Sequence, residues 1–230
     1  MSVMNDGWRL VTRLGEAQIL LPATFVALLW LLRPAHAPRS ALWWLAGTAA
    51  AALVTTASKI AFFGYEVGYA PLDYTGISGH AMFAAAVLPV LAALMAGGRP
   101  LHWRRAAIGA GYALAALIAY SRLRVDAHSP SEALAGMALG SVASALALSA
   151  SRLPDRRPPL WLGAGLLLWM LSLPLGAPPS PTHGWVVRLS LALSDRAEPY
   201  SRDAMHRDYQ REPRRRTTAQ ASTRLPLPTH

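Results

Sequence analysis

Residues 80–97, HAMFAAAVLPVLAALMAG, are the stretch of sequence that decides the fold. After His80 the stretch contains no charged side chain and is dominated by alanine, leucine and valine. A helix built from it has apolar residues all round, whereas a surface helix of a soluble protein has a polar face. About 20 such residues cross the hydrocarbon core of a bilayer. The stretch therefore predicts a membrane-spanning helix.

Five further apolar runs surround this one, and each is long enough, or nearly so, to span a bilayer. They are residues 17–32, 41–63, 106–120, 132–150 and 160–176. Small residues at Gly136, Gly140, Ser141 and Ser144 favour close helix packing in lipid. We therefore predict an all-α protein, folded as a six-span transmembrane helix bundle.

The composition agrees with a membrane protein. Only 15% of the 230 residues are charged, whereas soluble domains average about 25%. A soluble helical bundle is the alternative, and the charge deficit disfavours it. The chain has no cysteine, which excludes disulfides, thiolate metal sites and cysteine nucleophiles. The net charge of +10 lies at the ends of apolar runs and in the C-terminal tail. A lipid bilayer is therefore the expected anionic partner, with no nucleic acid, and no protein partner is evident.

The first apolar run raises the question of a signal peptide. Residues 35–37, Ala-His-Ala, resemble a cleavage site, but Arg33 and Pro34 intervene and residues 1–16 are long and mixed in charge. An uncleaved span is the favoured interpretation.

The flanking segments divide the chain into four parts. Residues 1–16 and 179–194 contain tryptophan, arginine and aliphatic residues, a mixture typical of segments that lie in the membrane interface. They enclose a transmembrane domain at residues 17–178. Residues 195–230 are polar and rich in arginine and proline, so we predict a disordered basic tail.

Loop charge predicts the orientation. Arginines collect in the connections after the first, third and fifth runs: Arg33, Arg39, Arg99, Arg104, Arg105, Arg152, Arg156 and Arg157. The charges in residues 64–78 and 121–131 nearly cancel. The positive-inside rule therefore places these two connections outside the cytoplasm. We expect a protein of the bacterial inner (cytoplasmic) membrane whose polar site faces the periplasm or exterior.

Polar and ionisable residues gather at this same predicted face. Alternating topology brings together the end of the second run, the start of the third, the end of the fourth and the start of the fifth. The residues there are Lys59, Ser78, Gly79, His80, Ser121, Arg122, His128 and Glu132. Any one of them alone would be explained as an interfacial anchor or packing group. Ionisable residues at membrane depth are costly and mark functional sites, so their convergence predicts a site.

These residue types suit an anionic substrate. Gly79 at a helix start lets backbone N–H groups approach an anion, and Ser78 is a reasonable N-cap. Arg122 offers a planar fork for phosphate oxygens, and Lys59 a point charge. His80 is placed to donate a proton to a leaving group.

His128 and Glu132 are four residues apart and share one helix face. A carboxylate there can hold one imidazole nitrogen and make the other more nucleophilic. The same spacing could bind a metal, but no third ligand is obviously near. We therefore predict neither metal nor cofactor. Positioned cations, donors and a nucleophile are what phosphoryl transfer requires.

The spacing of these residues resembles the type 2 phosphatidic acid phosphatase superfamily, which includes bacterial acid phosphatases and vanadium haloperoxidases. Its third motif, Ser-Arg, five residues, His, three residues, Asp, is present at Ser121-Arg122, His128 and Glu132, with glutamate for aspartate. Its second, Pro-Ser-Gly-His, appears at residues 77–80 without the proline. Of the first, Lys, six residues, Arg-Pro, only Lys59 is present, and Glu66-Val67 stands where Arg-Pro would be.

The resemblance implies roles for single residues. His128 would attack phosphorus and form a phosphohistidine, Glu132 would orient it, and His80 would protonate the leaving group. The phosphate oxygens would be held by Lys59, Ser78, Gly79, Ser121 and Arg122. The implied enzyme is a metal-independent hydrolase of a lipid phosphate or lipid diphosphate.

Two other functions remain open. The absent Arg-Pro at residues 66–67 favours a non-catalytic lipid-phosphate-binding protein on a degenerate scaffold. A phosphotransferase between lipid carriers would use the same site. Of the three, we predict the phosphatase.

Overall fold

The computed structural model describes residues 2–33, 37–150, 159–176 and 180–211, and this part of the chain is helical and contains no β-strand. A single isolated bridge joins Tyr69 to Tyr74. The helices are α1 (Ser2–Arg13), α2 (Ala17–Leu31), α3 (Pro38–Tyr65), the short 3-10 helix η1 (Ala70–Leu72), α4 (Gly79–Met95), α5 (Leu101–Arg124), α6 (Pro130–Ala150), α7 (Leu160–Gly176), α8 (Thr182–Ser194) and a short helix over residues 202–211. The six apolar runs of the sequence correspond to α2 to α7.

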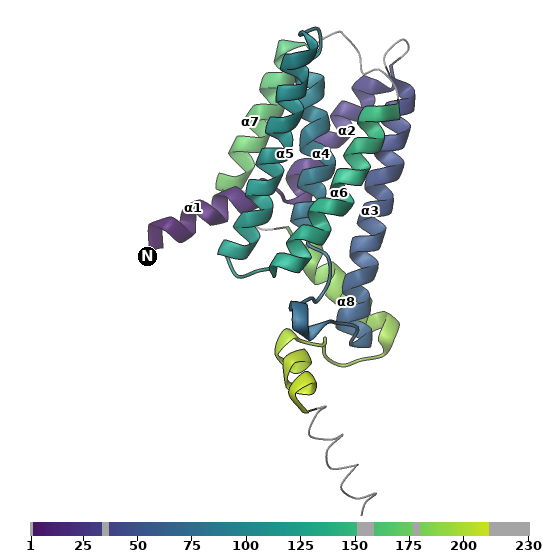
Figure 1. Ribbon diagram of the computed structural model, residues 1–230, viewed down its shortest axis with the longest axis vertical. Helices are drawn as coiled ribbons and strands as arrows, with labels where there is room; N and C mark the ends of the chain where they lie inside the picture. Colours follow the sequence, from purple (N-terminus) through teal and green to yellow (C-terminus); the bar gives the residue numbers. More distant parts are fainter. Residues whose placement is uncertain (1, 34–36, 151–158, 177–179, 212–230) are drawn as a thin grey trace, which may run out of the picture.

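The helices α2 to α7 stand side by side as a bundle, while α1 projects to one side (Figure 1). Most residues of α4 are buried, and α4 packs along both α5 and α6. The deciding stretch of the sequence is therefore the centre of the bundle. α8 and the helix at 202–211 lie at the end where α4 begins (Figure 1).

Glycine on α6 allows its close approach to α4. A methyl group on Gly140 would overlap the carbonyl of Met82, and one on Gly136 would lie 2.5 Å from the carbonyl oxygen of Ser78. The helix backbones therefore nearly touch, as the small residues of α6 predicted.

Buried polar side chains join neighbouring helices. Trp44 Nε1 of α3 donates to the carbonyl of Ala86 on α4 over 2.8 Å. The hydroxyls of Tyr112 on α5 and Ser144 on α6 are 2.9 Å apart. Such bonds fix helix register where no water is present to compete.

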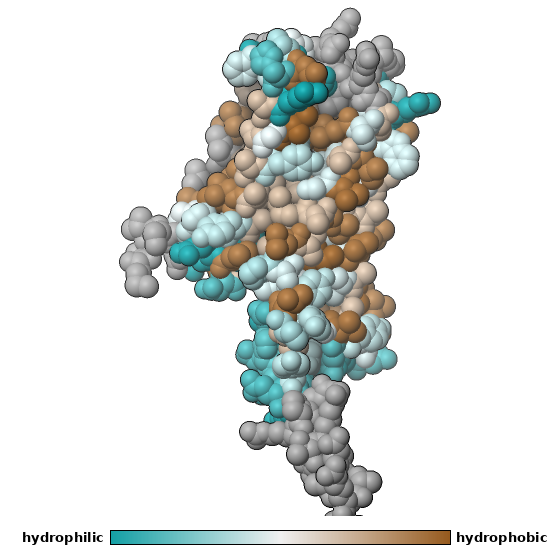
Figure 2. Space-filling model, viewed as in Figure 1, coloured by the Kyte–Doolittle hydropathy of each residue, from teal (hydrophilic) through white to brown (hydrophobic). Residues whose placement is uncertain are grey.

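Four of the described helical segments are long and apolar enough to cross a membrane: Gly7–Leu31, Pro38–Tyr65, Leu101–Arg124 and Pro130–Ala150. Two further apolar helices, Gly79–Met95 and Trp161–Met170, are shorter. The helical bundle is confirmed, but the predicted count of six full spans is not. On the face drawn in Figure 2, apolar residues cover most of the middle of the molecule and hydrophilic residues gather toward both ends.

The segment after α8 differs from the predicted disordered tail. Residues 202–211 form a helix, and Met205 on it is 5% exposed. Tyr200 N–H donates to the carbonyl of Phe63 over 2.9 Å. Residues 195–211 are thus tied to the end of α3, while residues 212–230 of the predicted tail lie outside the described residues.

Candidate active site

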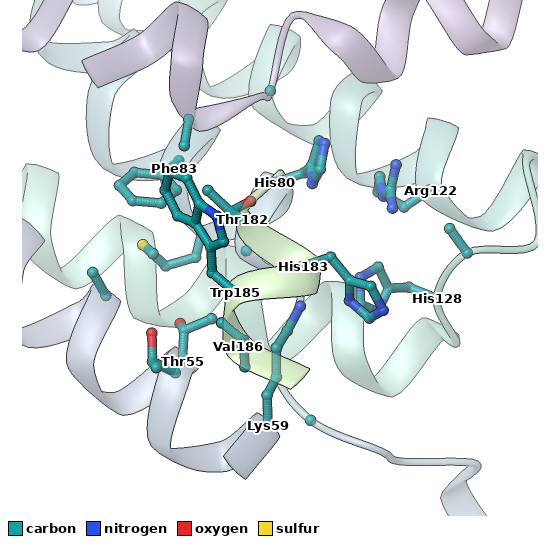
Figure 3. Close-up of a pocket in the computed structure, with 18 of the residues that line it drawn as sticks. Thr55, Lys59, His80, Phe83, Arg122, His128, Thr182, His183, Trp185 and Val186 are labelled. Atoms are coloured by element: carbon teal, nitrogen blue, oxygen red, sulfur yellow. The ribbon is translucent and has the colours of Figure 1, made fainter. Parts of the chain in front are cut away.

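A cavity of about 550 Å³ opens at the end of the bundle where α4 begins. Its polar lining includes Lys59, His80, Arg122 and His128, together with His183 of α8. Figure 3 shows these side chains pointing into the same space, from α3, α4, α5, the loop before α6, and α8. Four of the residues predicted from sequence to act together are therefore neighbours in space.

Local structure explains how the histidine reaches the cavity. α5 ends at Arg124, Asp126 takes a left-handed φ of 53°, and the chain turns into α6 at Pro130. The N–H groups of Ala127 and His128 both donate to the carbonyl of Arg122, over 3.0 and 3.3 Å. This turn fixes His128 beside Arg122.

His128 is oriented by Glu132. Its Nδ1 lies 2.6 Å from Glu132 Oε2. A carboxylate can only accept, so Nδ1 carries the hydrogen and Nε2 has a free electron pair. Burial lowers the pKa of His128, although the hydrogen bond to Glu132 raises it. The ring is thus neutral at neutral pH, with its free electron pair on Nε2.

Glu132 is completely buried and held from several sides. Thr75 donates to Oε1 through its backbone N–H (2.7 Å) and its hydroxyl (2.5 Å). The N–H of Ser129 donates to Oε2 over 3.1 Å. A buried carboxylate needs such donors to remain ionised. The longer side chain that replaces the family's aspartate therefore still reaches the histidine.

The cations have free donor capacity toward the cavity. Arg122 Nη1 donates to Thr12 Oγ1 of α1 over 2.8 Å, while its buried Nε has no hydrogen-bond partner among the described residues. Lys59 forms no ion pair within that same part of the chain. Gly79 also lines the cavity, at the N-terminus of α4. An anion would satisfy both the charges and the helix end.

Ser78 and Ser121 do not line the cavity. Ser78 stands at the N-cap position of α4, as expected, but its side chain makes no capping bond. Its N–H donates to the carbonyl of Glu132 over 3.1 Å. Ser121 Oγ donates to the carbonyl of Ile118 over 2.6 Å. Both are completely buried. Their phosphate-binding role stays a prediction, and their positions support a role in packing.

Glu66 occupies the position of the family's first-motif arginine. It follows α3 with a left-handed φ of 62°. Its half-exposed carboxylate pairs with Arg196 at 2.5 Å and lies outside the cavity lining. The substitution therefore leaves no negative charge inside the cavity.

Some site residues were missed by sequence reasoning. His183 and Trp185 of α8 line the cavity, although their segment was expected only to lie in the interface. The ring of His183 packs on Phe63, with centroids 5.6 Å apart. Gly76 has a φ of 129° and approaches Lys59. The sequence signal for a site residue on α8 is His183, two positions before Trp185.

Comparison with known proteins identifies the family. The PAP2 superfamily model matches residues 59–156. An uncharacterized 22.5 kDa protein in the cps region of Klebsiella pneumoniae is 34% identical over 205 residues, which are 87% of this chain and 98% of the relative. No solved structure matches. The chain belongs to the PAP2 superfamily, the family that its motifs resembled.

Family and fold together define the class. PAP2 proteins are generally phosphatases, and the helices are apolar enough to cross a membrane. The chain is therefore an integral-membrane protein of phosphatase type, a phosphoester hydrolase in coarse terms.

Proposed function

We propose that this protein hydrolyses a membrane lipid phosphate or diphosphate through a phosphohistidine on His128. The observation that carries the proposal is one cavity holding an oriented neutral imidazole, two cations and a second histidine. These are the parts that a phosphoryl transfer needs.

The first step follows from the tautomer of His128. The electron pair on Nε2 attacks phosphorus, and the bond from phosphorus to the leaving oxygen breaks. His80 gives its proton to that oxygen, so a neutral alcohol or a protonated phosphate departs. The positive charge that develops on the imidazole is stabilised by Glu132 through Nδ1.

The second step releases phosphate. Water attacks phosphorus, His80 takes the proton from the water, and the P–N bond breaks. The electron pair returns to Nε2, which restores His128. Lys59, Arg122 and the N–H groups at Gly79 balance the charge of the phosphoryl oxygens in both steps. No step requires a metal or cofactor.

A lipid is the favoured substrate because the rest of the cavity wall is apolar. Leu21, Phe63, Phe83, Trp185 and Val186 line it beside the cations. A molecule with a phosphate at one end and a hydrocarbon part would fill both regions. The loop charges support an extracytoplasmic location of this end.

The direct test is phosphate release from lipid phosphates in detergent with a chelator present, comparing wild type with His128→Ala. We expect release by the wild type alone. Equal release by both proteins would refute the proposal. Lipid binding without turnover would instead favour the non-catalytic function that the first-motif departure at Glu66 suggests. Transfer to a second lipid would identify a phosphotransferase.

A further inference from the structure

The carboxylate that orients His128 has a partner from far along the chain. Arg202 Nη2 donates to Glu132 Oε1 over 2.9 Å and to Oε2 over 3.0 Å. Glu132 is 0% exposed and the Arg202 side chain 33% exposed. Arg202 lies outside residues 59–156, which the family model matches. The contact therefore belongs to this chain's own C-terminal segment.

The same arginine is fixed on its other side. Nη1 donates to the carboxylate of Asp73 and, over 2.8 Å, to its backbone carbonyl. His206 Nε2 lies 2.7 Å from the second Asp73 oxygen. Arg202 Nη2 also lies 3.2 Å from Thr75 Oγ1, the hydroxyl that donates to Glu132. One guanidinium thus joins the 66–78 connection to the base of α6.

We infer that Arg202 is a positioning residue for the reaction at His128, and that the segment of residues 196–206 is part of the catalytic unit. The inference rests on the proposed function. Arg202 does not line the cavity, so it acts through Glu132. Because glutamate is longer than aspartate and has one more rotatable bond, anchoring both carboxylate oxygens limits the directions in which it can face.

A fixed cation beside the carboxylate also sets the charge balance around the nucleophile. The other titratable and charged groups facing His128 come from every packed element: Lys59, His80, Arg122, Glu132 and His183. Arg202 offsets the negative charge of Glu132, so its removal leaves that charge free to stabilise an imidazolium. The pKa of His128 should then rise.

The test uses full-length Arg202→Leu and Arg202→Lys, with Arg207→Leu as the matched control. Arg207 is an exposed arginine on the same short helix and, among the described residues, forms no ion pair. We expect kcat of Arg202→Leu to fall about tenfold or more. A loss of this size is typical when a residue that hydrogen-bonds to a functional side chain, without touching the substrate, is removed. The KM of Arg202→Leu should change little, and Arg207→Leu should match the wild type.

Two readouts separate positioning from loss of folded protein. The acid limb of the kcat/KM profile should move to higher pH in Arg202→Leu and stay near the wild-type position in Arg202→Lys, which retains the charge. The pKa of His128 is followed by NMR of histidine-labelled protein, with His128→Asn to assign its signal. This pKa should rise in Arg202→Leu and stay near the wild-type value in Arg202→Lys. A smaller kcat with an unmoved limb and an unmoved pKa would overturn the inference.

The NMR result holds independently of turnover. If the wild type shows no turnover that depends on His128, the proposed function is refuted. A raised pKa of His128 in Arg202→Leu would still show that the contact between Arg202 and Glu132 acts on His128. Turnover in the wild type with no change in Arg202→Leu would refute the inference and leave the proposed function standing.

Discussion

The motif-bearing helices and the C-terminal segments contribute different things to the same site. α3 to α6 supply the cavity's cations and the oriented histidine, each on or beside an apolar helix. α8 and residues 195–211 supply a third histidine and the arginines that pair with Glu66, Asp73 and Glu132. Glu132 of α6 orients His128 from within the motif region, whereas the arginine that holds Glu132 comes from a separate part of the chain.

The largest effect should follow removal of the nucleophile. His128→Ala should lower kcat by about 10⁴-fold or more, since loss of a nucleophile removes the covalent route. His102→Ala, at the exposed opposite end of α5, is the control and should be unaffected. The measurement is release of inorganic phosphate, and a fall of less than tenfold would contradict the assigned role.

Substitution of Arg122 tests how much a cation on α5 contributes to activity. Arg122→Ala should lower kcat/KM by about 10²-fold to 10³-fold, the effect of removing a preorganised donor from developing negative charge. Arg105→Ala, an exposed arginine on the same helix, should leave the steady-state kinetics unchanged. An equal loss of kcat/KM in both variants would indicate that the overall positive charge of α5, and not the position of Arg122 in the cavity, supports activity.

His183 tests the contribution of α8. Burial and the charges of Lys59 and Arg122 lower its pKa, so it enters the cavity as a neutral donor. His183→Ala should lower kcat/KM about tenfold, equivalent to one neutral hydrogen bond to a charged group, and His183→Gln should recover part of it. The measurement is kcat/KM of both variants. Wild-type values in both would contradict a contact between His183 and the phosphate.

The pH profile provides a smaller, signed test. Because the pKa of His128 is lowered from 6.5, the imidazole stays neutral, and hence nucleophilic, to lower pH than an ordinary histidine. Once the substrate's own titration is divided out, the fall in kcat/KM from pH 7 to pH 6 should be smaller than an ordinary histidine would give. An ordinary pKa would give about a threefold fall over this interval, and that fall would count against the burial of the ring.

The smallest effect is expected at Glu66, which stands where the family's first motif has arginine. Glu66→Gln removes a half-exposed ion pair with Arg196, and such pairs contribute about 0–1 kcal/mol. Activity should stay within about twofold and the midpoint of thermal unfolding should change little, as measured by a detergent melt. A rise of tenfold or more in activity would mean that Glu66 reaches the cavity after all.

The sequence predicted the helices well and the site in part, for physical reasons. Apolar runs such as residues 41–63 predict spans because charged side chains are costly in the hydrocarbon core. Residues 80–97 instead form a shorter helix, which is buried at the centre of the bundle. The contact between His128 and Glu132 was predicted, but not its local structure: His128 lies in the turn before α6 and not on a shared helix face. Arg202 was not predictable, because its contact with Glu132 crosses 70 positions and its polar segment has the composition of disorder.

The central claim is that His128 carries the phosphoryl group between the two steps. The most direct measurement is rapid quenching of the wild type during turnover of a lipid phosphate labelled in the phosphate, followed by peptide mapping. We predict acid-labile, alkali-stable label on the peptide containing His128, absent from His128→Ala. Turnover at full rate with no label on that peptide would contradict the account.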